Sequence, residues 1–88
     1  MYEIRLKKSL EKVFEKLAKK DIVALEIIRK KVKQIKENPY QFKPLSNNLK
    51  NTWRVHIKKS FVLTYKISEE KKIVELVDYD HHDNIYKN

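Results

Sequence analysis

The fold is decided by residues 53–67, whose sequence is WRVHIKKSFVLTYKI. On each side of the central KKS, apolar residues alternate with other residues, which is the two-residue period of a half-buried strand. The pattern predicts two antiparallel strands joined as a hairpin. The apolar residues of both strands share one sheet face only if Ile57 lies opposite Phe61, which makes residues 58–60 a three-residue loop. A two-residue loop would bury Arg54 instead.

This register predicts a pair of basic side chains on the sheet face that points away from the core. Arg54 lies opposite Thr64 and His56 lies opposite Val62, so the arginine and the histidine stand side by side above small residues. Such a surface could hold a phosphate. Trp53 shares the inward face with apolar neighbours, and we expect it in the core rather than on a base-stacking surface.

The sequence before the hairpin predicts a strand and two helices. Residues 2–6 alternate as a short strand, and we expect the first helix to be capped by Ser9 and the second by Asp21. Apolar residues recur along one stripe of each helix, and Asn38-Pro39 ends the second. The two helices should form an antiparallel hairpin that covers one sheet face. Residues 39–52 predict an irregular connection.

The chain after the hairpin predicts one more strand and a final turn of helix. Residues 73–79 have apolar side chains on both faces, which is typical of a central strand that is covered on both sides. Asp80 can cap a helical turn with Asp83 at the capping-box position. His82 and Tyr86 are then four residues apart and point the same way.

The chain contains neither glycine nor cysteine. The absence of cysteine excludes disulfides and thiolate zinc sites, and the absence of glycine excludes a glycine-rich phosphate-binding loop. Turns with a left-handed backbone must use other residues, and Asn47, Asn48 and Asn51 are the natural candidates. The first residues lack the apolar stretch that export needs, so we expect a cytoplasmic protein with no membrane partner.

The charge of the chain is strongly positive. Against 12 Asp and Glu residues it has 21 Lys and Arg residues, a formal net charge of +9 in only 88 residues. A small domain with this balance attracts polyanions, and nucleic acid is the first candidate. An acidic protein and an anionic membrane are the alternatives, and lysine-rich surfaces also arise from genome composition or heat adaptation.

All three histidines fall in the second half of the chain, at His56, His81 and His82. Histidine is the side chain that most readily exchanges protons near neutral pH, so acid-base chemistry should lie here. His81 and His82 are adjacent and should point apart, which favours a structural role for one of them. A metal site made from residues 80–83 is conceivable, but the spacing fits no zinc pattern.

Taken in order, these elements resemble one known family, the RelE/ParE toxin superfamily of toxin-antitoxin systems, and within it the mRNA-cleaving RelE and YafQ-like branch. The resemblance rests on the helical hairpin, on residues 44–49, 53–57 and 61–65, and on the ending HDNIY over 82–86. It implies a single RelE-like α+β domain over residues 1–88, with the order β-α-α-β-β-β. The helical hairpin would pack on a small, mainly antiparallel, twisted sheet with a short C-terminal helical turn.

The resemblance implies a ribosome-dependent endoribonuclease that cleaves mRNA in the A site and inhibits translation. The ribose 2′-OH would attack the adjacent phosphate, and this step needs a base, an acid and cations but neither a metal nor a cofactor. Matched position by position, the catalytic residues are Arg54, His56, His82 and Tyr86. Arg54 would hold the phosphate, His56 or His82 would carry the proton, and Tyr86 would stack on the reactive nucleotide or hydrogen-bond to it.

The same resemblance places further basic residues around the RNA and shows one departure. RelE-like enzymes often carry an arginine on the second hairpin strand, where this chain has Val62. Neighbouring basic side chains would have to supply that charge. The residues expected to contact RNA phosphates are Lys50, Lys58, Lys59, Lys66 and His81.

Two other functions stay open. The chain could be a ParE-like protein that inhibits DNA gyrase by binding alone, although the ending over 82–86 speaks against it. It could also be a degenerate basic domain that binds antitoxin or RNA without chemistry, for which Val62 is the main support. The resemblance further implies a RelB-like antitoxin with an acidic, amphipathic helical segment as partner. The enzyme would in addition bind the ribosome and its mRNA.

Overall fold

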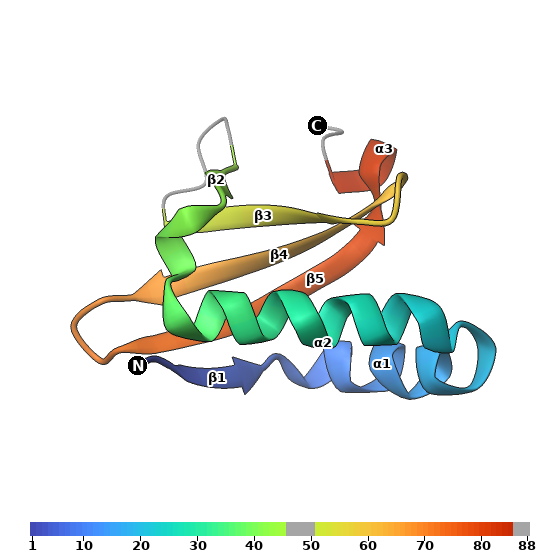
Figure 1. Ribbon diagram of the computed structural model, residues 1–88, viewed down its shortest axis with the longest axis horizontal. Coiled ribbons are helices and arrows are strands. Elements are labelled where there is room, and N and C mark those ends of the chain that lie inside the picture. Colours follow the sequence, from blue (N-terminus) through green and yellow to red (C-terminus); the bar gives the residue numbers. More distant parts are fainter. Residues whose placement is uncertain (46–50, 86–88) are drawn as a thin grey trace.

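The computed structural model describes residues 1–45 and 51–85. The chain has an α+β fold in which two helices pack against one sheet, as the sequence predicts (Figure 1). Its elements are β1 (Glu3–Leu6), α1 (Lys8–Lys20), α2 (Ile22–Glu37), the 3-10 turn η1 (Pro39–Gln41), β2 (Lys43–Pro44), β3 (Thr52–Ile57), β4 (Phe61–Ser68), β5 (Ile73–His81) and α3 (His82–Ile85).

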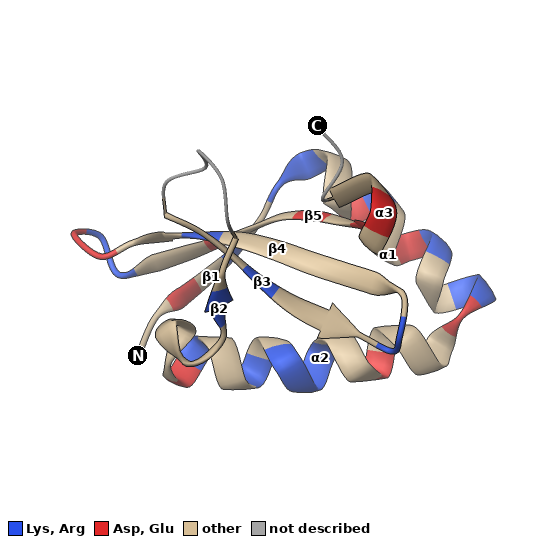
Figure 2. Cartoon of the chain, turned by 90° about the horizontal axis from the view of Figure 1, so that it is seen from above, with Lys and Arg blue, Asp and Glu red and all other residues tan. Residues whose placement is uncertain are grey.

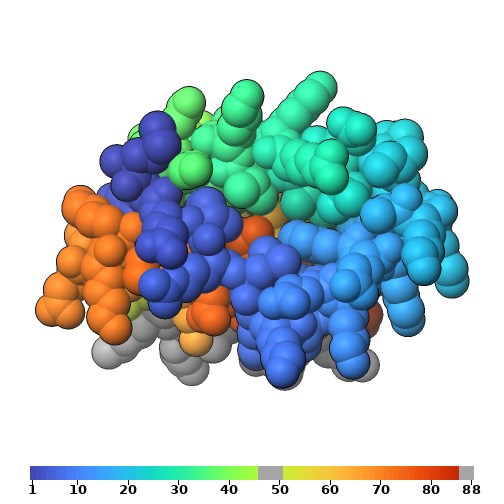
Figure 3. Space-filling view, turned by 90° about the horizontal axis from the view of Figure 1, so that it is seen from below, coloured from blue at the N-terminus to red at the C-terminus, as the bar shows by residue number. Residues whose placement is uncertain are grey.

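The five strands form one sheet in the order β1-β5-β4-β3-β2. The pair β1 and β5 is parallel and the other pairs are antiparallel. Helices α1 and α2 lie side by side beneath the sheet (Figure 3), and α3 lies on its other side. We call the face opposite α1 and α2 the outer face; Arg54, His56, Thr64 and Lys66 lie on it, and Figure 2 is seen from that side.

The core lies between the sheet and the helical hairpin. Alternate residues of β3 and β4 point into it, and Trp53 packs against its edge, as expected. The largest fully buried side chain is Tyr65, whose hydroxyl donates a hydrogen bond to the Pro39 carbonyl at 2.7 Å. The buried core residues are Leu10, Ile28, Ile35, Val55, Ile57, Leu63, Tyr65, Ile67, Val74, Leu76 and Tyr79.

The predicted hairpin register is confirmed. Ile57 pairs with Phe61, and the outer-face pairs Arg54 with Thr64 and His56 with Val62 follow from it. The loop adopts a left-handed backbone at Lys58, with φ 56°. Lysine was not among the residues expected to adopt this conformation.

The prediction for Asn51 is confirmed by its φ of 60°, and Lys72 adopts a similar backbone with φ 56°. The other two candidates, Asn47 and Asn48, lie outside the described residues.

Of the two caps predicted for the helical hairpin, one is correct and the other is not. The Asp21 side chain accepts a hydrogen bond from the Ala24 backbone N–H at 3.1 Å and begins α2 as expected. The prediction of Ser9 as the first cap is wrong, because α1 already begins at Lys8 with Lys7 in the cap position. The Lys7 N–H still bonds to the Leu76 carbonyl, so the helix begins directly after the strand and leaves no room for a cap at residue 9.

The first part of the connection, residues 39–44, is more regular than predicted. The Asn38 side chain accepts a bond from the Tyr40 N–H and starts η1, and β2 then pairs with β3. The prediction of an irregular connection is therefore wrong for Pro39–Gln41 and Lys43–Pro44. The short strand matters because it places Lys43 opposite Arg54 on the outer face.

The last strand differs from its prediction in length and pattern. A bulge between Thr64 and Tyr65 pairs these residues with Asp78 and Leu76, so Val77 is an extra residue on β5. The bulge resets the alternation, which explains the apolar residues on both faces without a second covering layer. The strand also runs on to His81, so Asp80 lies within it and the prediction of Asp80 as helix cap is wrong.

Candidate functional site

Two histidines meet on the outer face where β3 and α3 come together. The rings of His56 and His82 are stacked, with centroids 5.7 Å apart and planes inclined by 25°. His82 is held in place because its backbone N–H donates to the Ser60 carbonyl of the hairpin loop at 2.6 Å. Both histidines are exposed, and half-buried Arg54 lies two residues before His56 on the same face.

The local structure around α3 explains why the adjacent histidines point apart. The Nδ1 atom of His81 accepts a hydrogen bond from the Asp83 backbone N–H at 3.2 Å and so acts as the helix cap. The His81 ring also packs edge-on against Phe61, with centroids 5.6 Å apart. Asn84 secures the turn through a hydrogen bond from its amide to Asp80. His81 therefore supports the helix, while His82 faces His56.

The surroundings of His56 favour its neutral form. Although His56 is exposed at the surface, the partial loss of its hydration lowers its pKa, and the positive charges of Arg54, His82 and Lys43 lower it further. The ring should therefore be unprotonated at neutral pH and ready to accept a proton. An imidazole that accepts a proton beside fixed cations suits a reaction at a phosphodiester, where a hydroxyl loses its proton and negative charge develops.

A pocket of about 340 Å³ opens beside His56. Lys43 on β2 and Lys31 on α2 contribute positive charge to it, and the Lys31 ammonium group lies 5.6 Å from the centre of the Phe42 ring. Sequence reasoning missed both lysines, since Lys43 reaches Arg54 only through the unpredicted strand β2. The pocket is lined by Lys31, Gln41, Phe42, Lys43, Arg54, Val55 and His56.

The remaining candidate residues are spread over different places. Lys66 is exposed on the outer face and Lys59 is exposed in the hairpin loop. The Lys58 ammonium group forms an ion pair with Asp21 at 2.9 Å, which ties the loop to the helical hairpin and separates Lys58 from Arg54. Tyr86 and Lys50 lie outside the described residues.

The outer face is not uniformly basic. Val62 is fully buried in the row between His56 and Asp80, and Asp78 lies opposite Thr64 in the next row. In these two rows the positive charge therefore lies on the β2 and β3 side of the sheet, where the pocket lies, and carboxylates occupy the β5 side.

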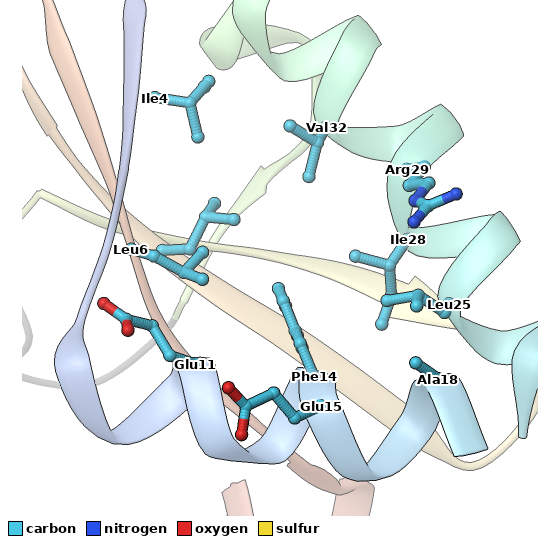
Figure 4. Close-up of a pocket in the computed structure, with 11 residues that line it drawn as sticks. Ile4, Leu6, Glu11, Phe14, Glu15, Ala18, Leu25, Ile28, Arg29 and Val32 are labelled. Carbon is cyan, nitrogen blue, oxygen red and sulfur yellow. The ribbon is translucent and has the colours of Figure 1, made fainter. Parts of the chain in front are cut away.

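A second hollow, an apolar groove of about 620 Å³, lies on the helical side of the molecule. In Figure 4, side chains of β1, α1 and α2 face a shared space, among them Leu6, Phe14 and Ile28. Glu11, Glu15 and Arg29 are the charged residues of its lining.

Within residues 1–45 and 51–85, no three His, Asp or Glu side chains lie close enough together to hold a metal ion. Over the same part of the chain, no helix is both long and apolar enough to cross a membrane.

Comparison with known proteins identifies the family. Residues 3–86 match the family model described as ParE toxin of type II toxin-antitoxin system, parDE. A Methanocaldococcus jannaschii protein that carries the name toxin RelE4 is 49% identical over 87 residues, which cover 99% of this chain and 93% of that protein.

Solved structures of toxins share the fold at low sequence identity. The toxin fold in the Escherichia coli RelBE toxin-antitoxin complex matches with a TM-score of 0.80 at 18% identity, covering 92% of this chain and 96% of that chain. The YoeB/ParE toxin from Agrobacterium tumefaciens matches with a TM-score of 0.78 at 17% identity, covering 91% and 98%. Together with the matched family model, these comparisons show that the chain belongs to the ParE/RelE family and is a toxin of a type II toxin-antitoxin system.

Proposed function

We propose that this toxin is a metal-independent endoribonuclease that cleaves mRNA in the ribosomal A site and so arrests translation in the cytoplasm. The observation that carries the proposal is the position of His56, whose pKa is lowered by burial and by its cationic neighbours and which lies beside Arg54 and His82. This arrangement provides a base, a phosphate-binding cation and a second imidazole on one surface. A protein that acts by binding alone does not need it.

The reaction needs a proton to be removed at one oxygen and delivered at another. His56 takes the proton from the ribose 2′-OH as the 2′-oxygen bonds to phosphorus, and Arg54 holds the phosphate oxygens. His82 gives a proton to the 5′-oxygen as its bond to phosphorus breaks. The products are a 2′,3′-cyclic phosphate and a free 5′-hydroxyl. Tyr86 is assigned to the reactive base, by stacking or through its hydroxyl.

Other basic residues are assigned to the RNA backbone. Lys43 joins this group because it lines the pocket with Arg54 and His56. Lys58 and His81 also contact Asp21 and Asp83 within the protein. The residues expected from the sequence to bind RNA phosphates are Lys50, Lys58, Lys59, Lys66 and His81.

An antitoxin with an acidic, amphipathic helical segment is the proposed protein partner. The Escherichia coli relative is known as a complex with its antitoxin, which supports this expectation. The apolar groove between α1 and α2 would take the apolar face of such a segment, and the exposed lysines of both helices would meet its acidic face. Association should be fast and should slow as salt is raised. An association rate independent of salt would contradict this account of the +9 charge.

Primer extension on a defined mRNA bound to ribosomes tests the activity. The samples are wild type, an Arg54→Ala/His82→Ala variant, a Lys12→Ala/Lys16→Ala control on exposed α1 positions, and a reaction without ribosomes. We expect A-site cleavage by wild type and control only, and only with ribosomes. Intact mRNA with wild type would refute the proposal.

Inhibition of DNA gyrase is the second candidate, because the matched family model is described by the ParE toxin of parDE. A supercoiling assay with purified gyrase separates the two activities. Loss of supercoiling together with intact mRNA would favour gyrase binding. If both assays were negative while antitoxin still bound, the chain would be a degenerate domain without its own activity.

A further inference from the structure

A second basic pocket lies on the outer face, away from the histidine pair. It has a volume of about 470 Å³ and no role in the chemistry proposed above. Its walls come from β1, the residue before β3, β4, the turn before β5, and β5 itself. The lining residues are Arg5, Asn51, Lys66, Ile67, Ser68, Lys71, Ile73 and Glu75.

The strand register explains how distant parts of the chain bring charges to this pocket. Glu75 pairs with Lys66 on one side and with Arg5 on the other, so these three residues form a row across β4, β5 and β1. Lys71 adds a third cation from the turn, and three cations against one carboxylate leave the pocket net positive. Arg5 also contacts Glu3 through Nε at 3.3 Å, which uses one of the five N–H donors of its guanidinium.

The chemistry of the lining suits a nucleic-acid backbone rather than a base. Arginine, lysine, a serine hydroxyl and an asparagine amide are the groups that usually contact phosphate and sugar. The lining contains no aromatic residue on which a base could stack. A strand held here would be bound without regard to its sequence.

The two basic pockets are joined across the sheet by cationic residues. Arg54 pairs with Thr64, and Lys66 is the next outer-face residue along β4, so Arg54 and Lys66 are diagonal neighbours about 7–8 Å apart. Lys43 extends the line on one side, and on the other side Arg5 lies beyond Glu75. From β2 to β1 the line crosses four strand spacings, or about 19 Å. At about 3.4 Å per stacked nucleotide, this distance spans no more than about six nucleotides.

We propose that the pocket formed by Arg5, Lys66, Ser68 and Lys71 is a phosphate-binding subsite that holds the RNA strand a few nucleotides away from the bond that is cut. The inference rests on the proposed function for the identity of the ligand as RNA. The subsite itself binds RNA and takes no part in the chemistry.

Binding of short RNAs of different lengths tests the subsite. Fluorescence anisotropy is measured with fully 2′-O-methylated oligonucleotides of two, four, six and eight residues, which cannot be cleaved because the 2′-oxygen is blocked. The proteins are wild type, Arg5→Ala/Lys71→Ala, and the control Lys12→Ala/Lys16→Ala, which removes the same charge from exposed positions on α1. Thermal unfolding of each variant checks that the fold is intact.

Affinity of the wild type should rise with length and level off at about six nucleotides. Each phosphate contact on a single strand contributes about a factor of five between 1 M and 0.1 M salt, so the Arg5→Ala/Lys71→Ala variant should bind the eight-residue RNA about 25-fold more weakly at 0.1 M. Its affinity for the two-residue RNA should be unchanged. The slope of log affinity against log salt should fall by about 1.4.

The inference is overturned if wild type does not bind the eight-residue RNA, if the control variant loses as much affinity as the Arg5→Ala/Lys71→Ala variant, or if all lengths are affected equally. These outcomes can be told apart from failure of the proposed function. If RNA binding depends on length but mRNA on the ribosome stays intact, the proposed subsite stands and the proposed nuclease activity is refuted. If mRNA is cleaved but RNA binding does not depend on length, the nuclease activity stands and the subsite is refuted.

Discussion

Removing one buried hydroxyl should destabilise the protein measurably. Tyr65 is 0% exposed, and its hydroxyl donates to the Pro39 carbonyl at 2.7 Å. Pro39 is fully buried as well and begins η1, which leads into the segment that carries Lys43. In Tyr65→Phe the ring still fills its place in the core, but the carbonyl loses its donor in a position that the side-chain packing closes to solvent.

The expected loss follows from the cost of a buried polar group without a partner. A buried acceptor without a hydrogen bond costs about 1–3 kcal/mol of unfolding free energy. For a domain of this size each kcal/mol shifts Tm by about 4–8 °C, so Tm should fall by about 4–24 °C. Urea denaturation followed by circular dichroism should show a lower midpoint with an unchanged slope.

The matched control is Tyr40→Phe. Its hydroxyl also makes a hydrogen bond, to Glu69 at 2.7 Å, but the side chain is 43% exposed and water can replace the lost partner. We expect a loss within about 0.5 kcal/mol. If Tyr65→Phe is no less stable than Tyr40→Phe, the bond between β4 and η1 does not contribute net stability and the reasoning is wrong.

Three further predictions concern charged groups whose pKa values are shifted. Asp21→Ala should lower Tm at pH 7, because hydrogen bonds from Lys58 and from the helix backbone hold the pKa of Asp21 below its usual value. Thermal melts at decreasing pH should show the difference in Tm from wild type vanish below about pH 4, where the carboxylate becomes protonated. Glu69→Gln should also lower Tm at neutral pH, because hydrogen bonds, first from Lys72, lower the pKa of Glu69 to about 2. The stabilisation by the Glu69 carboxylate is complete above about pH 4.5 and is lost towards pH 2. A variant with the same Tm as wild type at pH 7 would contradict this prediction. Arg54→Ala should raise the pKa of His56 in an NMR titration, although burial, the larger cause, still holds it down; no change would mean that the arginine charge does not act on the imidazole.

Much of the fold could be predicted from the sequence because its signals are local. The alternation over 53–67 allows one register for the hairpin, since a shift by one residue would move every apolar side chain to the wrong face. The cap at Asp21 is similarly local, because the side chain bonds to a backbone N–H three residues away. These predictions are confirmed.

The wrong predictions about the fold share a different cause. The strand β2, the early start of α1 and the bulge at Val77 all depend on pairing with residues far along the chain. The bulge is an example. The sequence of β5 alone has apolar residues on both faces, and only its pairing with β4 shows that one residue is extra. No local pattern contains that information.

The same division applies to the site. The alternation along one strand was enough to predict that Arg54 and His56 lie on one face, because residues two apart in a strand point the same way. That His82 rather than His81 stacks on His56, and that Lys43 lies opposite Arg54, became visible only in the folded chain. The reason is that hydrophobic alternation reports which face a side chain occupies within its own strand. Which charges meet across the sheet depends on pairings between segments that are distant in the chain.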